Sequence, residues 1–315
     1  MSSPQTHRFR AMNCSMAAWV YSDESAAGVA LHQVEAWMRR VEAELSRFQP
    51  QSDLSHLNAV AGAAYRAGDI LWQVTDLALA TAKATGGRFD PTLGQALCAA
   101  GYDRSFDLLA PDEAAAAPSP HRPDAWQDIL LDAATHTITL PPDVALDLGG
   151  IAKGWAADQA LHLLEPFGPA LVDAGGDLAV GAPPPDAPGW GLGIADPLQP
   201  EADVAMVQLA GCGLATSGTD HRRWQQRNHI QHHILDPLTG KPALTDLLTA
   251  SVIAPTAVEA DVQALVLVAG GLTAAHSWLR DHPHLSVLLI HNDGSPYQTP
   301  NFTDHAIAYF PIYHN

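Results

Sequence analysis

The segment Asp147-Leu148-Gly149-Gly150-Ile151-Ala152-Lys153-Gly154 constrains the fold of this chain more than any other stretch. It places an acid at the expected end of a strand, then a glycine turn, then a lysine at the start of a helix. Glycine backbone can approach a phosphate closely, N–H groups at a helix start can point at it, and a lysine can neutralise it. The order differs from the Walker pattern, in which the lysine follows a longer loop and precedes Ser or Thr. By itself the segment fits a structural turn, the commoner case, as well as a phosphate site.

Length and composition indicate a globular protein. The 315 residues suffice for a sizeable core, in one large domain or two intimately packed ones. A hydrophobic content of 47% and a charged content of 16% are typical of a folded chain rather than a disordered one. The formal charge of −18 argues against nucleic acid and anionic membranes as partners. Protonation of some of the 16 histidines would reduce this negative charge only slightly.

Cysteines and the N-terminal residues bear on the cellular compartment. Cys14, Cys98 and Cys212 match no metal-finger or redox spacing, so we expect buried, reduced thiols. Residues 1–10 contain no apolar stretch like that of a signal peptide, and no run approaches the roughly 18 apolar residues of a membrane span. We therefore expect a cytoplasmic protein without membrane insertion.

Hydrophobic periodicity predicts interspersed helices and strands. Helices are expected over 25–47, 71–85, 256–270 and 272–281, and a further helix of about 15 residues is expected to follow the motif that ends at Gly154. Strands are expected at 129–131, 137–140, 170–172, 190–195, 205–209, 231–235, 251–254 and 286–290. A Pro- and Ala-rich surface loop is expected at about 110–125, and a turn at Gly175-Gly176-Asp177. Without a regular βαβ alternation, this pattern favours a mixed α/β or α+β structure. No clear boundary divides the chain, so we predict a single domain over residues 1–315.

The segment from Pro255 to Asp261 has the features of a helix start. Thr256 and Glu259 have the spacing of a capping box, which makes Glu259 a cap rather than a catalyst. Asp261 lies one turn into this helix. Two interpretations stay open for it: an acid stabilised by the helix dipole, or a ligand for a hard cation such as Mg²⁺.

Further polar segments lie between residues 215 and 242. Ala215-Thr216-Ser217-Gly218 offers hydroxyls and a tight turn ahead of the paired Arg222-Arg223. Adjacent residues on a strand point to opposite faces, so His232 and His233 are not expected to share one zinc ion. Either could orient a substrate or transfer a proton. A turn is expected at Thr239–Pro242.

Two segments in the first third of the chain combine polar residues with an aromatic one. They are Gly86–Gly94 and Leu45–Phe48 with the following Ser52–Ser55. Each alone predicts a turn with a packing aromatic side chain.

Taken together, these segments resemble the ApbE family, the FAD:protein FMN transferases. Eight segments match in the family's order: Met12–Cys14, Leu45–Phe48 with Ser52–Asn58, Thr85–Gly94, Asp147–Gly154, Leu171–Gly181, Ala215–Gly218, His233–Gly240 and Ile253–Asp261. They span nearly the whole chain. The resemblance implies an ApbE-like fold with mixed sheets, packed helices and intimately joined subdomains. It also implies an enzyme that binds FAD and Mg²⁺, attaches FMN to a Thr or Ser hydroxyl of an acceptor protein, and releases AMP.

Site residues follow from the resemblance, position by position. The residues that would bind FAD are Met12, Phe48, Arg88, Phe89, Asp90, Asp147, Lys153 and Leu235. Asp261 resembles the metal-binding aspartate of the family, and Gly150 matches a residue that gives an oxygen to the ion. His233 matches a histidine implied to be needed for transfer, so both His233 and Asp261 are candidates for the base that deprotonates the incoming hydroxyl.

The chain departs from the family pattern at two positions. Leu265 occupies the position, four residues after the metal aspartate, where the family usually has a threonine that can reach the ion. Asn13 follows Met12 where glycine is usual, and the export signal of many family members is not seen. Two alternatives to transfer therefore stay open: a flavin-binding protein without transfer activity, and a hydrolase that splits FAD into FMN and AMP.

Overall fold

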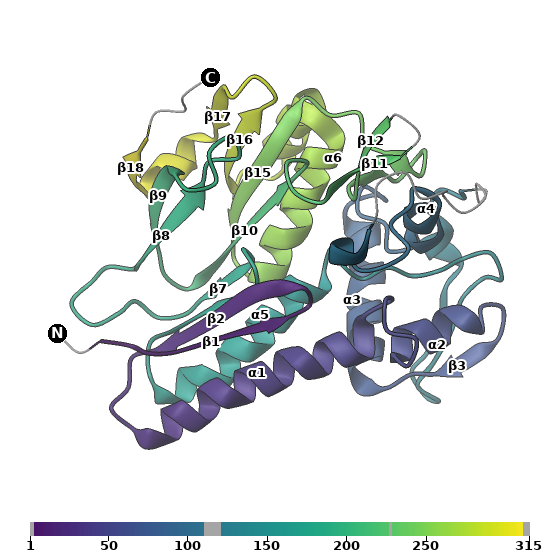
Figure 1. Ribbon diagram of the computed structural model, residues 1–315, viewed down its shortest axis with the longest axis horizontal. Coiled ribbons are helices and arrows are strands. Elements are labelled where there is room, and N and C mark those ends of the chain that lie inside the picture. The colour runs from purple at the N-terminus through teal and green to yellow at the C-terminus, as the bar shows by residue number, and fades with distance from the viewer. Residues whose placement is uncertain (1–2, 110–120, 227–228, 311–315) are drawn as a thin grey trace. The chain divides into compact units, whose positions relative to one another are not determined.

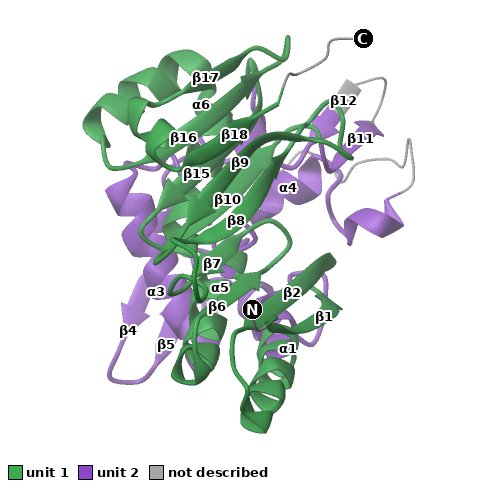
Figure 2. Ribbon diagram, turned by 90° about the vertical axis from the view of Figure 1, so that its left-hand side faces the viewer, with its two compact units in different colours: residues 1–39, 153–220, 245–315 green, residues 40–152, 221–244 purple. Residues whose placement is uncertain are grey.

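The computed structural model describes residues 3–109, 121–226 and 229–310 of the chain (Figure 1). Over these residues the chain forms two compact units, coloured separately in Figure 2. Unit 1 comprises residues 1–39, 153–220 and 245–315, and unit 2 comprises residues 40–152 and 221–244. The single domain over residues 1–315 stays a prediction. Most of the expected surface loop, residues 110–120, lies outside the described residues.

Unit 1 holds the larger sheets and the longest helices. Its strands are β1 (Gln5–Ala11), β2 (Cys14–Val20), β6 (Ala170–Asp173), β7 (Leu178–Val180), β8 (Trp190–Ala195), β9 (Asp203–Leu209), β10 (Cys212–Gly218), β15 (Leu247–Ala254), β16 (Ser286–His291), β17 (Pro296–Gln298) and β18 (Ala306–Tyr309). Its helices are most of α1 (Ser25–Leu45), nearly all of α5 (Ala152–Leu164), α6 (Ala257–Asp281) and the 3-10 turns η3 (Glu165–Phe167) and η4 (Pro300–Asp304).

The main sheet of unit 1 has the strand order β1-β2-β6-β7-β10-β15-β16-β17, with antiparallel pairing between neighbours. A smaller sheet, β18-β9-β8, packs on it through a shared apolar core. Leu214, Ile253 and Leu288 of the main sheet meet Val207 and Leu209 of the smaller one in this core. Side chains alternate between the two faces of a strand, so the neighbours of these core residues on β10 and β15 point to the other face of the main sheet. Helix α6 lies along β10 and β15 on that face (Figure 1).

Helices α5 and α6 are packed unusually close at their N-terminal ends. A Cβ atom on Gly154 would lie 2.7 Å from the carbonyl oxygen of Ala257 and 2.7 Å from Cα of Val258, so only glycine fits there. The Asp158 carboxylate of α5 accepts the N–H groups of Ala257 and Val258 at 2.9 and 3.0 Å. Two otherwise unpaired donors of α6 are thereby satisfied, which fixes the first turn of the helix that carries Asp261.

Helix α6 begins and bends where the sequence predicts. The N-cap hydroxyl of Thr256 accepts the N–H of Glu259, while the Glu259 carboxylate contacts His284 at 3.0 Å. The two predicted helices join at Gly271, whose φ of 69° breaks the helical geometry. Among the described helices, α6 alone is long and apolar enough to cross a membrane, but more than half of its apolar window is buried, as in a core helix.

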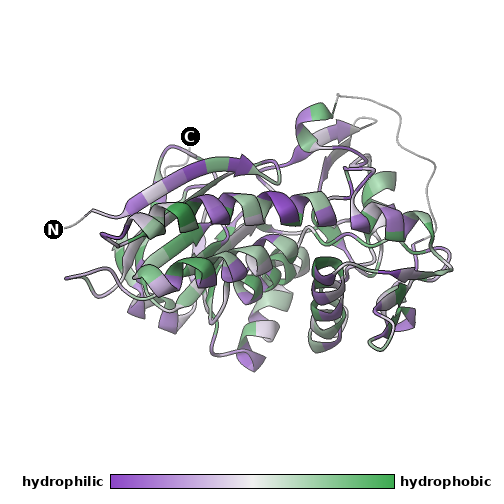
Figure 3. Cartoon of the chain, turned by 90° about the horizontal axis from the view of Figure 1, so that it is seen from below, coloured by the Kyte–Doolittle hydropathy of each residue, from purple (hydrophilic) through white to green (hydrophobic). Residues whose placement is uncertain are grey.

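Unit 2 has one long helix, α3, and otherwise short elements. Its helices are α2 (Asp53–Ala59), α3 (Asp69–Ala84), α4 (Gly94–Ala99) and the 3-10 turns η1 (Phe106–Leu108) and η2 (Ala125–Asp128); its strands are β3 (Ala64–Arg66), β4 (Leu130–Asp132), β5 (Thr137–Thr139), β11 (Arg223–Gln226), β12 (His229–His232), β13 (Leu235–Asp236) and β14 (Lys241–Pro242). Strands β4 and β5 form the predicted hairpin, with β3 on its other side. The long helices of the protein carry both hydrophilic and hydrophobic residues along their length (Figure 3), as expected for helices with one buried face.

Three local expectations were wrong. Residues 53–59 form helix α2 rather than a turn, because the Ser52 hydroxyl accepts the Ser55 N–H and so caps a helix. Residues 215–218 form part of β10, where pairing with β15 overrides the turn tendency of Ser and Gly. The cysteines are free thiols, as expected, but are partly exposed rather than buried.

Candidate functional site

The residues predicted from the sequence to form the site belong to both units. Met12, Lys153 and Asp261 lie in unit 1. Unit 2 contains the remaining predicted residues: Phe48, Arg88, Phe89, Asp90, Asp147, Gly150, His233 and Leu235.

Met12 and Asn13 form the tip of the β1–β2 hairpin in unit 1. Ala11 pairs with Cys14, so Met12 and Asn13 are the two loop residues, with φ angles of 48° and 58°. Two positive φ values are typical of a type I′ turn, the tight turn whose twist suits a hairpin. Asparagine adopts this conformation more readily than most residues, which explains how Asn13 can replace the usual glycine. Met12 is half-buried in a conformation that is costly for its side chain.

Lys153 occupies the second position of α5, as predicted, and lies between two acidic side chains. Its ammonium forms an ion pair with Asp177 Oδ2 and lies 4.0 Å from Asp261 Oδ2. The same Asp261 oxygen faces the N–H of Gly154 at 3.3 Å. Asp177 and Asp261 are only 2% and 4% exposed, so two buried carboxylates share one lysine.

Asp177 is a residue of this cluster that sequence reasoning placed in a turn but not in the site. It ends the predicted turn between β6 and β7, in which Gly175 and Gly176 have φ angles of 76° and 98°. The Gly176 N–H donates to Asp173 Oδ1 at 2.8 Å, and both glycines are exposed. Burial raises the pKa of Asp173, while the nearby charge of Lys153 opposes this rise. The available signal was the acidic residue directly after Gly-Gly, within a segment that matches the family.

This part of unit 1 fits a hard cation by its chemistry. Asp177 and Asp261 lie within 4.0 Å of the Lys153 ammonium, Asp173 interacts with its charge, and every side-chain donor of these acids is an oxygen. Over the described residues, no group of three or more His, Cys, Asp or Glu side chains has the arrangement of a complete metal site. Leu265, half-buried one turn after Asp261, adds no oxygen. An ion held by Asp261 would therefore take further ligands from water, backbone or phosphate, as Mg²⁺ usually does.

In unit 2, Asp147 forms a partly buried ion pair with Arg47. The two side chains are 18% and 8% exposed, and Arg47 Nε donates to Asp147 Oδ2 at 2.5 Å. Asp147 Oδ1 accepts the Gly149 N–H at 2.8 Å, which shapes the glycine turn. The prediction of a strand end at Asp147 was wrong: the residue follows an isolated bridge between Leu93 and Ala145, and Arg47 rather than a sheet fixes it.

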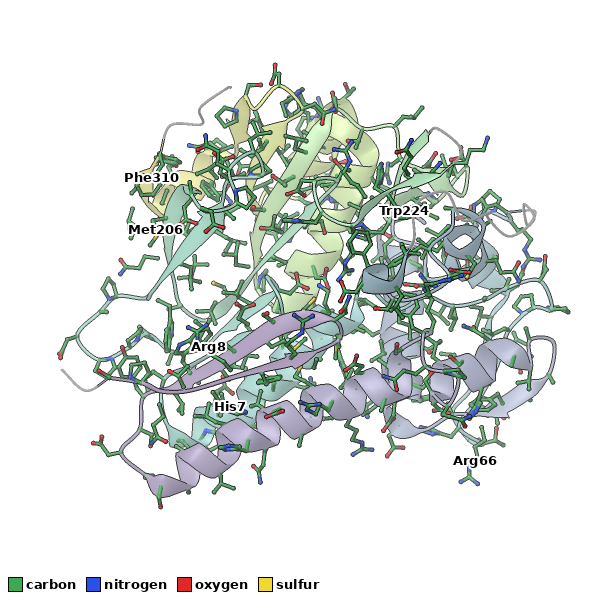
Figure 4. All side chains as sticks on the ribbon, viewed as in Figure 1. His7, Arg8, Arg66, Met206, Trp224 and Phe310 are labelled. Atoms are coloured by element: carbon green, nitrogen blue, oxygen red, sulfur yellow. The ribbon has the colours of Figure 1, made fainter. Side chains whose placement is uncertain are left out.

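Aromatic rings enclose the Arg47 guanidinium. Its carbon lies 4.2 Å from the ring centre of Phe48 and 4.8 Å from that of Tyr102. Trp224, labelled in Figure 4, lies 5.5 Å from Tyr102 and donates its indole N–H to the carbonyl of Ala100 at 2.9 Å. Leu235 is buried in the same apolar cluster. Two predicted FAD residues, Phe48 and Leu235, thus belong to the same apolar cluster.

Residues 85–94 form a compact loop after α3 that carries three predicted FAD residues. The Thr85 hydroxyl accepts the N–H of Phe89, which is buried, while Arg88 is exposed. Asp90 Oδ1 accepts both the N–H and the hydroxyl of Thr92, at 2.7 and 2.5 Å. Its Oδ2 is buried without a hydrogen-bond partner among the described residues, and burial raises the pKa of Asp90. A buried oxygen without a hydrogen-bond partner is rare in native proteins, and water, an ion or a ligand can supply the partner.

The backbone connects this loop to the glycine turn. The Asp147 N–H donates to the carbonyl of Pro91 at 2.8 Å, and Gly94 N–H donates to that of Ala145 at 3.1 Å. Gly150 is half-buried in the turn that leads into α5. Its role as a metal ligand stays a prediction.

His232 and His233 are separated by the end of a strand. His232 is the last residue of β12, and burial lowers its pKa. His233 follows the strand, is half-buried, and precedes the buried Ile234 and Leu235. The turn expected at Thr239–Pro242 is present as a turn over 237–240 followed by β14. The catalytic role of His233 stays a prediction.

Comparison with known proteins identifies the family. A family model described as the ApbE family matches residues 12–289. The chain belongs to the ApbE family. It is 35% identical over 296 residues to the FAD:protein FMN transferase of Treponema pallidum (strain Nichols), covering 87% of this chain and 81% of that protein. It is 27% identical over 284 residues to one from Klebsiella pneumoniae (strain 342), covering 88% and 81%. The predicted homology to FAD:protein FMN transferases is thereby confirmed.

Solved structures confirm the predicted mixed α/β fold of the ApbE family. The crystal structure of an ApbE protein from Thermotoga maritima MSB8 matches with a TM-score of 0.83 and 25% identity, covering 96% of this chain and 98% of the other. The flavinyl transferase ApbE of Pseudomonas stutzeri, in its apo form, matches with a TM-score of 0.77 at 21% identity, covering 96% and 97%. This second likeness concerns the fold alone.

Proposed function

We propose that this protein transfers the FMN part of FAD onto a threonine or serine hydroxyl of an acceptor protein, in a Mg²⁺-dependent reaction that releases AMP. Family membership supports a flavin transferase. The observation that carries the proposal is the Lys153 ammonium beside the buried carboxylates of Asp177 and Asp261. A fixed positive charge next to an acid that can hold a cation is what transfer at a pyrophosphate requires.

The proposed reaction replaces the phosphoanhydride bond of the FAD pyrophosphate by a phosphoester bond to the acceptor. The acceptor oxygen bonds to the phosphorus on the FMN side of the pyrophosphate, the bond from that phosphorus to the bridging oxygen breaks, and AMP leaves with that oxygen. The hydroxyl proton passes to a base, for which Asp261 and His233 are both candidates. Lys153 stabilises the negative charge that develops on the phosphate oxygens. Mg²⁺, when bound at Asp261, supplies Lewis-acid stabilisation of the same charge.

Leu265 favours one rival function, flavin binding without transfer. It is the half-buried residue one turn after Asp261, and it offers no oxygen to an ion. We favour transfer because Asp261, Lys153 and the close packing of Gly154 on α6 are all present, and because water can supply the missing ligand.

The purified protein incubated with FAD, Mg²⁺ and an FMN-carrier domain tests the proposal. Covalent flavin on the carrier, seen as gel fluorescence under denaturing conditions and as the mass of FMN less water, would support transfer. AMP released equally without the carrier would indicate a hydrolase, and retained FAD without either product would indicate a binding protein. Asp261→Ala should abolish turnover while leaving much of the FAD binding. Asp281→Ala, at the exposed end of the same helix, is the matched control.

A further inference from the structure

Two carboxylates lie within 4.0 Å of the Lys153 ammonium, but the ammonium does not contact them equally. It is in direct contact with Asp177 Oδ2, whereas 4.0 Å separates it from Asp261 Oδ2. Its side chain is 16% exposed, and those of Asp177 and Asp261 are 3% and 5% exposed. Charges that are so poorly solvated interact strongly, and the lysine must remain paired with at least one of them.

The position of Asp177 is fixed by backbone rather than by the lysine. It follows Gly176 in the β6–β7 turn, and its carbonyl accepts the N–H of Ala174 at 2.9 Å. The next residue, Leu178, pairs with Asp173 across the turn. The carboxylate therefore holds the lysine from a rigid part of the main sheet.

The Asp261 carboxylate, in contrast, has few protein partners. Among the described residues, its polar neighbours are the Gly154 N–H at 3.3 Å and the Lys153 ammonium at 4.0 Å, and both face the same oxygen, Oδ2. A lysine released from Asp177 could close this 4.0 Å gap by a small side-chain rotation and form a direct ion pair. A paired carboxylate is a poorer ligand for a cation, because the cation must displace the ammonium.

We propose that Asp177 is a positioning residue that holds the Lys153 ammonium away from Asp261 and so keeps the Asp261 carboxylate available to a divalent cation. The proposal rests on the proposed function in that it takes Asp261 as the metal ligand. It assigns Asp177 no contact with the metal or with FAD. Its effect is exerted through the position of Lys153.

The test measures binding of Mn²⁺ to the full chain by the loss of its free-ion EPR signal, with Mg²⁺ as the competitor. Asp177→Asn preserves the shape of the side chain and removes its charge, so Lys153 should move to Asp261 and the dissociation constant for Mn²⁺ should rise about tenfold or more. Asp196→Asn is the matched control. Asp196 is also 2% exposed and in unit 1, and its carboxylate accepts the N–H of Leu198 in its own loop at 2.8 Å, so this variant should stay within about twofold of wild type.

Two variants of Lys153 separate this proposal from a role of Asp177 as a metal ligand. Lys153→Met alone should bind Mn²⁺ more tightly than wild type, because the competing ammonium is gone. Lys153→Met added to Asp177→Asn should restore Mn²⁺ affinity to the wild-type level or better. If Asp177 were itself a ligand, the double variant would bind as weakly as Asp177→Asn, and the proposal would be overturned.

Three results contradict the proposal: unchanged Mn²⁺ affinity in Asp177→Asn, a double variant that is not restored, and a wild-type protein that binds no Mn²⁺. Near-UV circular dichroism checks the fold of each variant. If Asp177→Asn alone does not fold, the double variant is compared with wild type, and a Mn²⁺ affinity below that of wild type would overturn the proposal. Because metal titration uses neither FAD nor a carrier, its result is independent of whether the protein transfers flavin. A failure to label the carrier would overturn the proposed function but would not change the comparison of Mn²⁺ affinities between wild type and the variants.

Discussion

Replacing Arg47 with methionine is expected to destabilise the protein by about 3 kcal/mol and to weaken FAD binding through Asp147. Arg47 donates to Asp147 Oδ2 at 2.5 Å, and its side chain is 8% exposed. Its guanidinium also lies 4.2 Å from Phe48 and 4.8 Å from Tyr102. Methionine fills a similar volume and packs well against aromatic rings, so the change removes charge and hydrogen bonds more than bulk.

The magnitude follows from the burial of the pair. Two unit charges about 4 Å apart attract by ~4 kcal/mol at an effective dielectric constant of about 20. Removing one partner of a fully buried pair costs about 3–5 kcal/mol, because the other charge is left buried. Asp147 is 18% exposed, so water recovers part of this cost and brings the ionic part to about 2 kcal/mol. Loss of the contacts with two aromatic rings adds about 1 kcal/mol.

A double-mutant cycle isolates the pair. The free energy of urea unfolding would be measured for Arg47→Met, Asp147→Asn, both together, and wild type, with FAD affinity measured in parallel. We expect a coupling energy of about 2 kcal/mol between the two positions. Arg47→Lys, which keeps the charge but loses the planar group that stacks on the rings, should lie between wild type and Arg47→Met. A coupling energy below about 0.5 kcal/mol would refute the argument that Arg47 fixes Asp147.

Three further predictions concern packing, pH and the metal. Gly154→Ala would bring a Cβ atom within 2.7 Å of the Ala257 carbonyl and should lower the unfolding free energy by about 1–3 kcal/mol in thermal unfolding. Gly28→Ala, whose Cβ would meet only a flexible side chain at 3.4 Å, is the control and should be neutral or stabilising; equal stability of the two variants would contradict the packing argument. Burial raises the pKa of the Asp90 carboxyl in the folded protein above its ordinary value of about 3.8. The protonated carboxyl therefore stabilises the folded state, and this stabilisation is lost as pH rises from the ordinary pKa through the raised one. Asp90→Asn should therefore gain unfolding free energy relative to wild type as pH rises through that window, and a difference that does not vary with pH would refute this. Leu265→Thr should tighten the apparent affinity for Mg²⁺ in the transfer assay, and an unchanged half-saturation concentration would mean that position 265 does not face the ion.

Local sequence was sufficient where neighbouring residues decide the structure. The apolar spacing over residues 25–47 predicted α1, and Thr256 with Glu259 predicted the start of α6. The break at Gly271 was also predictable, because glycine alone adopts its positive φ without strain. Residues 53–59 were missed because a helix of 7 residues gives too short a periodic pattern.

Residue types and the family resemblance likewise predicted the candidate site residues, but not how these residues are held. Lys153 after a glycine turn and Asp261 one turn into a helix were recognisable from spacing. Neither spacing nor composition could pair Lys153 with Asp177, 24 residues away, or Arg47 with Asp147, 100 residues away. Asp177 was read only as the end of a turn.

The sequence by itself thus determined the class of fold, the family and the residues that carry charge. These properties depend on short-range patterns and on residue identity, which the chain displays without being folded. Only the tertiary structure decided which charges meet, since burial of opposite charges depends on strands and helices brought together from distant parts of the chain. The glycine turn at 149–150 illustrates this difference between sequence and structure. Its residues are evident in the sequence, but Arg47, the partner that fixes Asp147 beside the turn, is known only from the folded protein.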